Sequence, residues 1–432
     1  MTVTRRSGEI LAIGFGTTVA MWGAGYVARL PVVLAPPAVV LAALLMALLA
    51  GGYVAGASGT RGVRGGAYAG ALTGLLNLLV LGSFLSTHDR TNALVPSAAL
   101  WVPGSIALSA AIAAAGAWIG GLRRRTGTVD WTAAFARVAV AATFLLLVVG
   151  GVVTSNQAGL AVVDWPRSYG YNMFLYPFSR MTGGIYYEHA HRLFGALVGL
   201  TTATLAVHVA RVESRGWVKR LAFTALALVI VQGTLGGLRV TETNLYLAVV
   251  HGVTAQVFFA LLVVIAIVLS PTWTGGRAPE AGPTVAGDRL AATLAVVALL
   301  VQIALGAIQR HLGLALMLHI GMAFVAAGLA ITAGARAWGL HQGEPVLKRA
   351  GLIVIYASGF QLMLGFMAWA ARGASAHGSL SSDWTIVVTT MHQGMGALLL
   401  ASAVALRAWT SRLIAPEPTS GTTRPARRTP DR

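Results

Sequence analysis

Four histidines at repeated spacing are the residues best suited to metal chemistry in this chain of 432 residues. The order His, Gln-x-x-Leu-Gly, His occurs twice. A lone histidine in an apolar helix is explained equally well by a hydrogen bond to a nearby carbonyl as by ligation. Matching places in a repeat instead favour ligands that face each other across a helical bundle, on a metal or a haem iron. The two copies are His191, Gln232-Gly-Thr-Leu-Gly236 and His251, then His319, Gln361-Leu-Met-Leu-Gly365 and His392.

The glutamine and glycine elements have two compatible interpretations. Small residues commonly allow close helix packing in membranes, and glycine also lets a flat macrocycle approach the backbone. A third element, Gln302-Ile-Ala-Leu-Gly306, precedes His319. The other histidines are weaker candidates, and His311 stays open between a substitute ligand, a propionate contact and no role. The weaker ones are His88, His189, His208, His341 and His377.

Glu188 is the most informative of only thirteen acidic residues. It precedes His191 by three residues and Arg192 by four, so all three can share one helix face. One interpretation of Glu188 is purely structural: an acid near a helix start that pairs with Arg192. The other is functional: a carboxylate at the rim of a porphyrin that acts as base, nucleophile or stabiliser of positive charge. Arg192 and Arg239 can instead pair with haem propionates.

Cysteine is absent. This excludes disulfides, iron–sulfur clusters, c-type haem attachment and thiol nucleophiles. Metal or redox chemistry therefore depends on the ten histidines and the acids.

The elements that carry these residues are expected to be membrane helices. The chain is 56% hydrophobic and 10% charged, with a mean hydropathy of +0.74, whereas soluble proteins are about 25% charged. At about 20 residues a span, about twelve helices fit, which predicts an all-α polytopic membrane protein. The expected spans are 9–29, 36–57, 66–86, 97–121, 134–154, 191–211, 221–239, 246–270, 290–308, 313–337, 350–370 and 386–409.

The basic excess indicates orientation. With a cytoplasmic N-terminus, 23 of the 31 Lys and Arg residues fall on the inside, as the positive-inside rule requires for an even number of spans. Both termini are therefore predicted to be cytoplasmic, and a net charge of +18 needs no nucleic-acid partner. An aromatic loop over 156–187 is expected outside, and a Gly/Pro-rich linker over 271–287 inside.

The expected spans divide the chain into four regions. Residues 1–126 form a block of about four helices without an assigned role, in which Asn77 is the only strongly polar deep residue. Residues 127–274 and 275–412 form two four-helix halves, and 413–432 a disordered tail.

Several motifs in order resemble the haem A synthase family, over roughly residues 130–410. They are Gly150-Gly-Val-Val-Thr154, Gly159-Leu-Ala161, Asp164-Trp165-Pro166, Glu188-x-x-His191-Arg192, Gln232-x-x-Leu-Gly-Gly-Leu-Arg-Val240 and His251-Gly252.

The resemblance implies two pseudosymmetric four-helix halves in a bacterial inner membrane. It implies oxidation of a methyl group of haem O to the formyl group of haem A, for terminal oxidase assembly. His191 and His251 would flank the substrate haem, His319 and His392 would ligate haem b, and Glu188 would be catalytic. Arg192, Arg239, Gln232, Gln361, Asp164 and Trp165 are expected to contact propionates or position the haems. Expected partners are lipid, haem O synthase and terminal oxidase subunits, with a homo-oligomer allowed and the electron acceptor open.

Two features depart from the family pattern. Some bacterial members carry a cysteine pair in an outer loop, and this chain has no cysteine, so a thiol mechanism is excluded. The family also lacks the first 126 residues, for which packing, assembly or partner docking is favoured.

Two other functions compete with the synthase. A two-haem b-type electron-transfer cytochrome would use the four histidines equally well, but has no evident need for Glu188. A haem carrier or transporter suits internal repeats, but the spans lack the mid-membrane acid or lysine pairs that ion coupling needs.

Overall fold

The computed structural model describes residues 2–30, 32–87, 90–275, 279–282, 284–376 and 382–416. Among these residues, twelve helices are long and apolar enough to cross a membrane, which confirms an all-α, multi-pass membrane protein. A short helix, α9 (Pro271–Thr274), lies in the linker between the two halves. The long helices are α1 (Thr2–Ala28), α2 (Pro37–Ser58), α3 (Gly62–Leu85), α4 (Ala98–Gly121), α5 (Trp131–Ser155), α6 (Gly183–Val212), α7 (Gly216–Thr241), α8 (Leu245–Val268), α10 (Val285–Leu312), α11 (Leu316–Leu340), α12 (Pro345–Ala376) and α13 (Ser382–Leu413).

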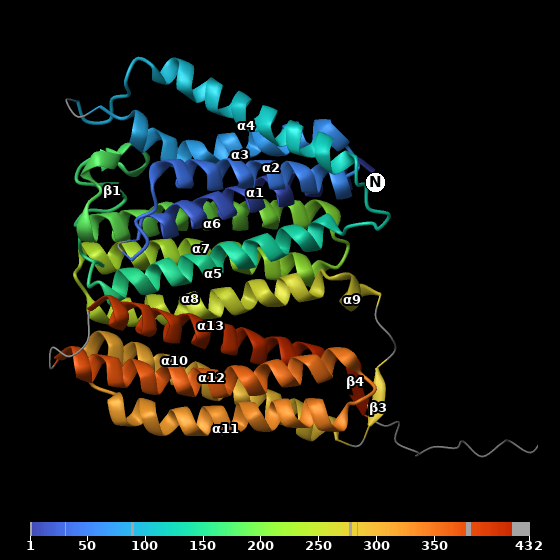
Figure 1. The fold of residues 1–432 in the computed structure, drawn as a ribbon. Helices are drawn as coiled ribbons and strands as arrows, with labels where there is room; N and C mark the ends of the chain where they lie inside the picture. Colours follow the sequence, from blue (N-terminus) through green and yellow to red (C-terminus); the bar gives the residue numbers. More distant parts are fainter. Residues whose placement is uncertain are drawn as a thin grey trace, which may run out of the picture.

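The helices form three groups in chain order (Figure 1). Helices α1–α4 pack on one side of α5–α8, chiefly through α1 against α5 and α6, while α10–α13 pack on the other side through α13 and α10. One apolar core joins the first group to the second, and another fills the third group. The start of α1 and strands β3 and β4 lie at one end of the bundle, and the β1–β2 hairpin at the other (Figure 1).

The start of α6 differs from the expected span. The helix begins at Gly183 rather than near His191, so Tyr186, Tyr187 and Glu188 lie inside it and not in the outer loop. Glu188 is 3% exposed. The loop folds back over these first turns, so protein rather than lipid surrounds the polar residues. Glu188 is therefore buried within the protein near the start of α6.

The outer loop has little regular structure. It contains a hairpin of two strands with two residues each, and two short 3-10 helices. The strands are β1 (Arg167–Ser168) and β2 (Tyr171–Asn172), and the 3-10 helices are η1 (Met173–Leu175) and η2 (Phe178–Arg180). The linker on the other side forms β3 (Glu280–Gly282), which pairs in parallel with β4 (Ile414–Pro416). The predicted tail thus begins with a strand, and residues 417–432 lie outside the described part of the chain.

Small residues set the packing of the first four helices. A Cβ on Gly52 or Gly56 would meet the carbonyl oxygen of Ala113 or Ala117 at 2.0 or 1.9 Å, so α2 and α4 touch backbone to backbone. Asn77 joins α3 to α1, because its Oδ1 accepts from Trp22 Nε1 at 2.9 Å. This bond gives Asn77 a packing role.

The absence of cysteine allows a clean test of orientation. Thr91 precedes α4 and Thr128 follows it, and both are exposed. We expect a membrane-impermeant maleimide to label Thr91→Cys in intact spheroplasts and Thr128→Cys only after lysis. The reverse labelling would place the termini outside.

Candidate functional site

Each candidate ligand histidine packs against a glycine of the neighbouring helix. This contact occurs in four consecutive helix pairs, α5–α6, α7–α8, α10–α11 and α12–α13. A side chain at any of these glycines would push into the imidazole, so glycine fixes how deeply each ring sits between its two helices. The distance from a Cβ built on the glycine to Cε1 of its histidine would be 3.0 Å for Gly150 and His191, 3.2 Å for Gly236 and His251, 2.9 Å for Gly306 and His319, and 3.1 Å for Gly365 and His392.

The histidines of the second half face each other. The ring centres of His319 and His392 lie 6.3 Å apart with the planes at 89°. Two metal–nitrogen bonds of about 2.0 Å, with about 1.15 Å from each nitrogen to its ring centre, give about 6.3 Å for two imidazoles on opposite sides of one metal ion. The spacing therefore has room for one iron between the rings.

The histidines of the first half lie on α6 and α8, where His191 packs against Gly150 of α5 and His251 against Gly236 of α7. Among the described residues, no group of three or more His, Asp or Glu side chains forms a metal site. Pairs of imidazoles fit a haem iron, because the porphyrin supplies the remaining ligands.

Three glutamines hold the backbone or ring of the histidine opposite them. Gln302 Nε2 donates to the carbonyl oxygen of His319 at 3.0 Å, and His319 Nδ1 lies 3.2 Å from the carbonyl oxygen of Gln302. The amide of Gln361 lies 3.2 Å from His392 Nδ1. With its amide turned to satisfy both ends, Gln232 donates to the carbonyl oxygen of His251 at 3.2 Å. His319 Nδ1 therefore has a backbone carbonyl partner, and the Gln302 amide also lies 3.5 Å from His319 Nε2.

Glu188 keeps one oxygen unbonded beside the first histidine pair. Its Oε1 accepts from Arg192 Nε at 3.2 Å, while the buried Oε2 has no hydrogen-bond partner among the described residues. Arg239 also acts on this carboxylate electrostatically. The expected ion pair with Arg192 therefore exists, yet leaves an oxygen available one helical turn from His191.

Arg192 and Asp164 hold the outer loop in place. Arg192 donates to the carbonyl oxygens of Val162, Asp164 and Arg167 at 2.8, 2.6 and 2.9 Å. Asp164 accepts from the backbone N–H groups of Tyr169 and Gly170 at 2.6 and 2.8 Å. The structure thus gives these residues a role in loop positioning and leaves Arg192 little capacity for a propionate.

Trp165 closes the loop against α7. A Cβ on Gly237 would lie 2.4 Å from the indole ring, so the indole lies directly on the backbone of α7, one residue from Gly236. The Trp165–Pro166 peptide bond is cis.

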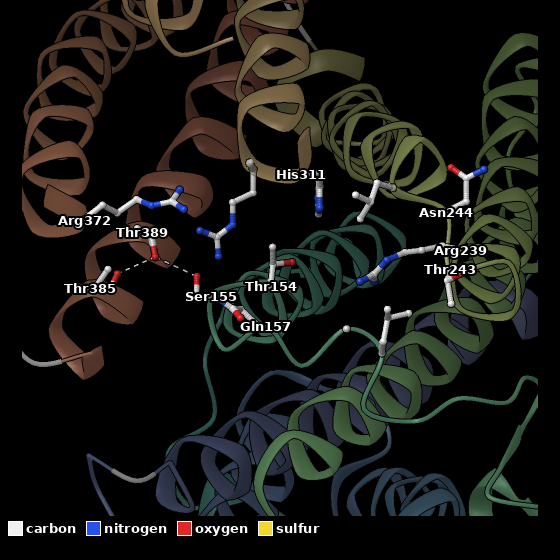
Figure 2. Close-up of a pocket in the computed structure, with 14 residues that line it drawn as sticks. Thr154, Ser155, Gln157, Arg239, Thr243, Asn244, His311, Arg372, Thr385 and Thr389 are labelled. Carbon is white, nitrogen blue, oxygen red and sulfur yellow. Dashed lines mark hydrogen bonds between the residues drawn. The ribbon is translucent and has the colours of Figure 1, made fainter. Parts of the chain in front are cut away.

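A basic cavity of about 540 Å³ lies between the two halves at the outer end (Figure 2). Its basic residues are Arg239, Arg310 and Arg372, with His311 beside them, and none of its described lining residues is acidic. Arg239, His311 and Arg372 approach the same space from three helices (Figure 2). Arg239 and Arg310 follow Gly236 and Gly306 by three and four residues, so the cavity is one turn outward from the imidazole contacts.

The sequence analysis assigned no role to Arg310 or Arg372. Both arginines could have been found from a pattern in the sequence, because an arginine follows the glycine of each Gln-x-x-Leu-Gly element by three to seven residues. His311, left open above, lines the cavity.

Other histidines make structural contacts. His189 Nδ1 lies 3.1 Å from Ser168 Oγ, His208 Nε2 lies 3.0 Å from Thr132 Oγ1, and His341 Nε2 lies 3.1 Å from Asp288 Oδ2. The remaining two, His88 and His377, lie outside the described residues.

The loop contacts predict the effect of replacing Arg192. A hydrogen bond to a charged group contributes about 1.5–3 kcal/mol, and lysine cannot reach three carbonyls at once. We expect Arg192→Lys to lower the melting temperature and expose the loop to protease between residues 160 and 172. Arg167→Lys, at an exposed position, is the matched control. Equal resistance of the two variants to the protease would contradict the role of Arg192 in holding the loop.

Comparison with known proteins agrees with this geometry. Residues 133–322 match the family model described as "Cytochrome oxidase assembly protein", a span that includes Glu188, His191, His251 and His319. A curated relative, "Heme A synthase" of Symbiobacterium thermophilum, is 35% identical over 185 residues, 40% of this chain and 57% of the relative. The match thus spans little more than half of that relative. The part of this chain that carries Glu188 and three of the four histidines is thus similar to the "Cytochrome oxidase assembly protein" family, and 185 residues of the chain are similar to a haem A synthase.

Proposed function

We propose that this protein is a haem A synthase, an oxidoreductase that converts the methyl group of haem O to the formyl group of haem A. Haem O would bind between His191 and His251, and haem b between His319 and His392. The observation that carries the proposal is the repeated imidazole–glycine contact, with a buried carboxylate, among the described residues, beside the first histidine pair and not the second. This asymmetry suits one reacting haem and one resident haem.

The residues present fit a haem in each half. The glycines let each imidazole lie against the neighbouring helix, and the ring separation of His319 and His392 suits one iron. Haem carboxylates would enter the basic cavity, where arginine pairs strongly with carboxylate. Arg239 would serve the first half, and Arg310 and Arg372 the second.

Glu188 is the residue of the first half that would take part in the reaction. Oxidation of the methyl group releases electrons and protons and takes its oxygen from water, so an electron acceptor outside this chain is required. The haem iron would supply redox chemistry when bound. Held by Arg192, Glu188 presents Oε2 to stabilise positive charge that develops at the substituent or to accept its proton.

The cellular setting follows from the same proposal. We place the chain in the bacterial cytoplasmic membrane with both termini inside, which the distribution of basic residues supports. Haem O synthase would supply the substrate, and terminal oxidase subunits would receive the product.

The role of Glu188 can be tested with Glu188→Gln, which retains shape and removes charge. We expect haem to remain bound while haem O accumulates, with conversion reduced about 100-fold or more, within the range of positioned acid–base groups. Extraction and mass analysis of the haem give the readout. Glu242→Gln, at an exposed glutamate, should convert normally.

Two outcomes would contradict the proposal. Unchanged haem A output from Glu188→Gln would remove Glu188 from the reaction. Only b-type haem, with no haem O or haem A under any condition, would favour the electron-transfer cytochrome.

The glycine contact in the second half can be tested separately. In Gly306→Ala the new Cβ would lie 2.9 Å from His319 Cε1, so the ring must move. We expect haem b binding to weaken about 10-fold, as for other changes next to metal ligands, with loss of low-spin absorbance. Gly321→Ala, where a Cβ meets nothing within 4 Å, should bind normally. Full haem b binding by Gly306→Ala would show that another residue is the ligand.

A further inference from the structure

The outer loop and helix α7 meet through two glycine contacts that run in opposite directions. Gly237 of α7 receives the indole of Trp165 from the loop, and Gly159 of the loop receives the guanidinium of Arg239 from α7. A Cβ on Gly159 would overlap Nη2 of Arg239 and would lie 2.9 Å from its Cζ and 3.2 Å from its Nη1. The guanidinium therefore occupies the space that a side chain at residue 159 would need.

The guanidinium of Arg239 differs from that of Arg192 in what it can still bind. Arg192 donates to Glu188 and to three carbonyl oxygens of the loop. The ion pairs and hydrogen bonds found among the described residues include none from the Arg239 guanidinium, which points into the basic cavity (Figure 2). Arg239 thus keeps its donors for a ligand, whereas Arg192 has used its own on the protein.

One stretch of the outer loop, residues 159–167, connects Arg239 to the carboxylate of Glu188. Arg192 pairs with Glu188 at 3.2 Å and holds three carbonyl oxygens of this stretch. The stretch begins at Gly159, against which the guanidinium of Arg239 packs. A single loop segment therefore sets the place of Arg239 relative to Glu188.

We propose that Gly159 is a positioning residue for Arg239, and that Arg239 makes the first half select a ligand with a free carboxylate. Gly159 and Arg239 both line the basic cavity, so any side chain at residue 159 would displace the guanidinium from its place there. Arginine binds a carboxylate strongly only when its planar fork is correctly oriented. That this ligand is a haem rests on the proposed function.

The selected carboxylate has a consequence for the orientation of a bound macrocycle. Two imidazoles on the iron define one axis, but they leave the macrocycle free to rotate about that axis. A carboxylate at the rim, bound by Arg239, removes this freedom and fixes the rotation. Because the same loop segment holds Glu188, Arg239 decides which substituent of the rim meets the carboxylate, as orientation of a reacting group requires.

The test measures the affinity of the full chain for two probes, haemin and haemin dimethyl ester, by titration of the Soret absorbance. A His319→Ala background removes the site of the second half. We expect haemin to bind about 10-fold more tightly than the ester, because only haemin offers a charged partner to Arg239. Gly159→Ala should lower the affinity for haemin about 10-fold and leave the affinity for the ester unchanged.

A double variant separates positioning of Arg239 from a general effect on the fold. Once Arg239→Ala has removed the guanidinium, adding Gly159→Ala should change neither affinity, since residues that act through one contact are not additive. The matched control is Gly199→Ala in α6, where a Cβ would meet nothing within 4 Å, and it should bind both probes as the parent chain does.

Three results would overturn the inference. They are equal affinities for haemin and its ester in the parent chain, an equal loss of both affinities in Gly159→Ala, and an unchanged affinity for haemin in that variant. Failure of the proposed function is a different result, because a chain that never converts haem O would still discriminate between haemin and its ester.

Discussion

The contact between an imidazole and a glycine of the adjacent helix is the constraint on which the rest of the structure depends. Because the glycine has no side chain, two helices approach until Cε1 of the histidine lies near the backbone, which sets both the helix spacing and the depth of the ring. Four copies of this unit place one imidazole against a glycine in each of four consecutive helix pairs.

The first four helices support the part of the protein that carries Glu188. Tyr26 of α1 stacks on Tyr186 at 5.8 Å between ring centres, and Trp22 meets Phe194 edge-on at 5.4 Å. At the outer end of α3, Ser86 Oγ donates to the carbonyl oxygen of Leu175 at 2.6 Å. Helix α6 and the loop before it are therefore held from the side opposite the second half, which gives residues 1–126 a mechanical role next to Glu188.

The sequence predicted the spans within a few residues, because hydropathy and length largely determine where a helix can cross a membrane. The repeat likewise predicted the pairing of His319 with His392. It did not predict that Glu188 lies in the second turn of α6, because that depends on a loop folding back over the helix. Nor could it show that Arg192 is occupied by loop carbonyls while Arg239 faces a cavity, since both arginines follow a motif residue and only tertiary contacts separate them.

The basic cavity between the halves has an energetic consequence for loading. Arg239 comes from one half and Arg310 and Arg372 from the other, so like charges face each other across the junction and repel. Carboxylates delivered by a ligand in either half reduce that repulsion for both. A first carboxylate in this cavity would lower its positive charge, so a second carboxylate from the other half would meet a weaker attraction and the negative charge of the first. By linkage the effect is equal in both directions, and binding of the second would therefore be favoured less than binding of the first.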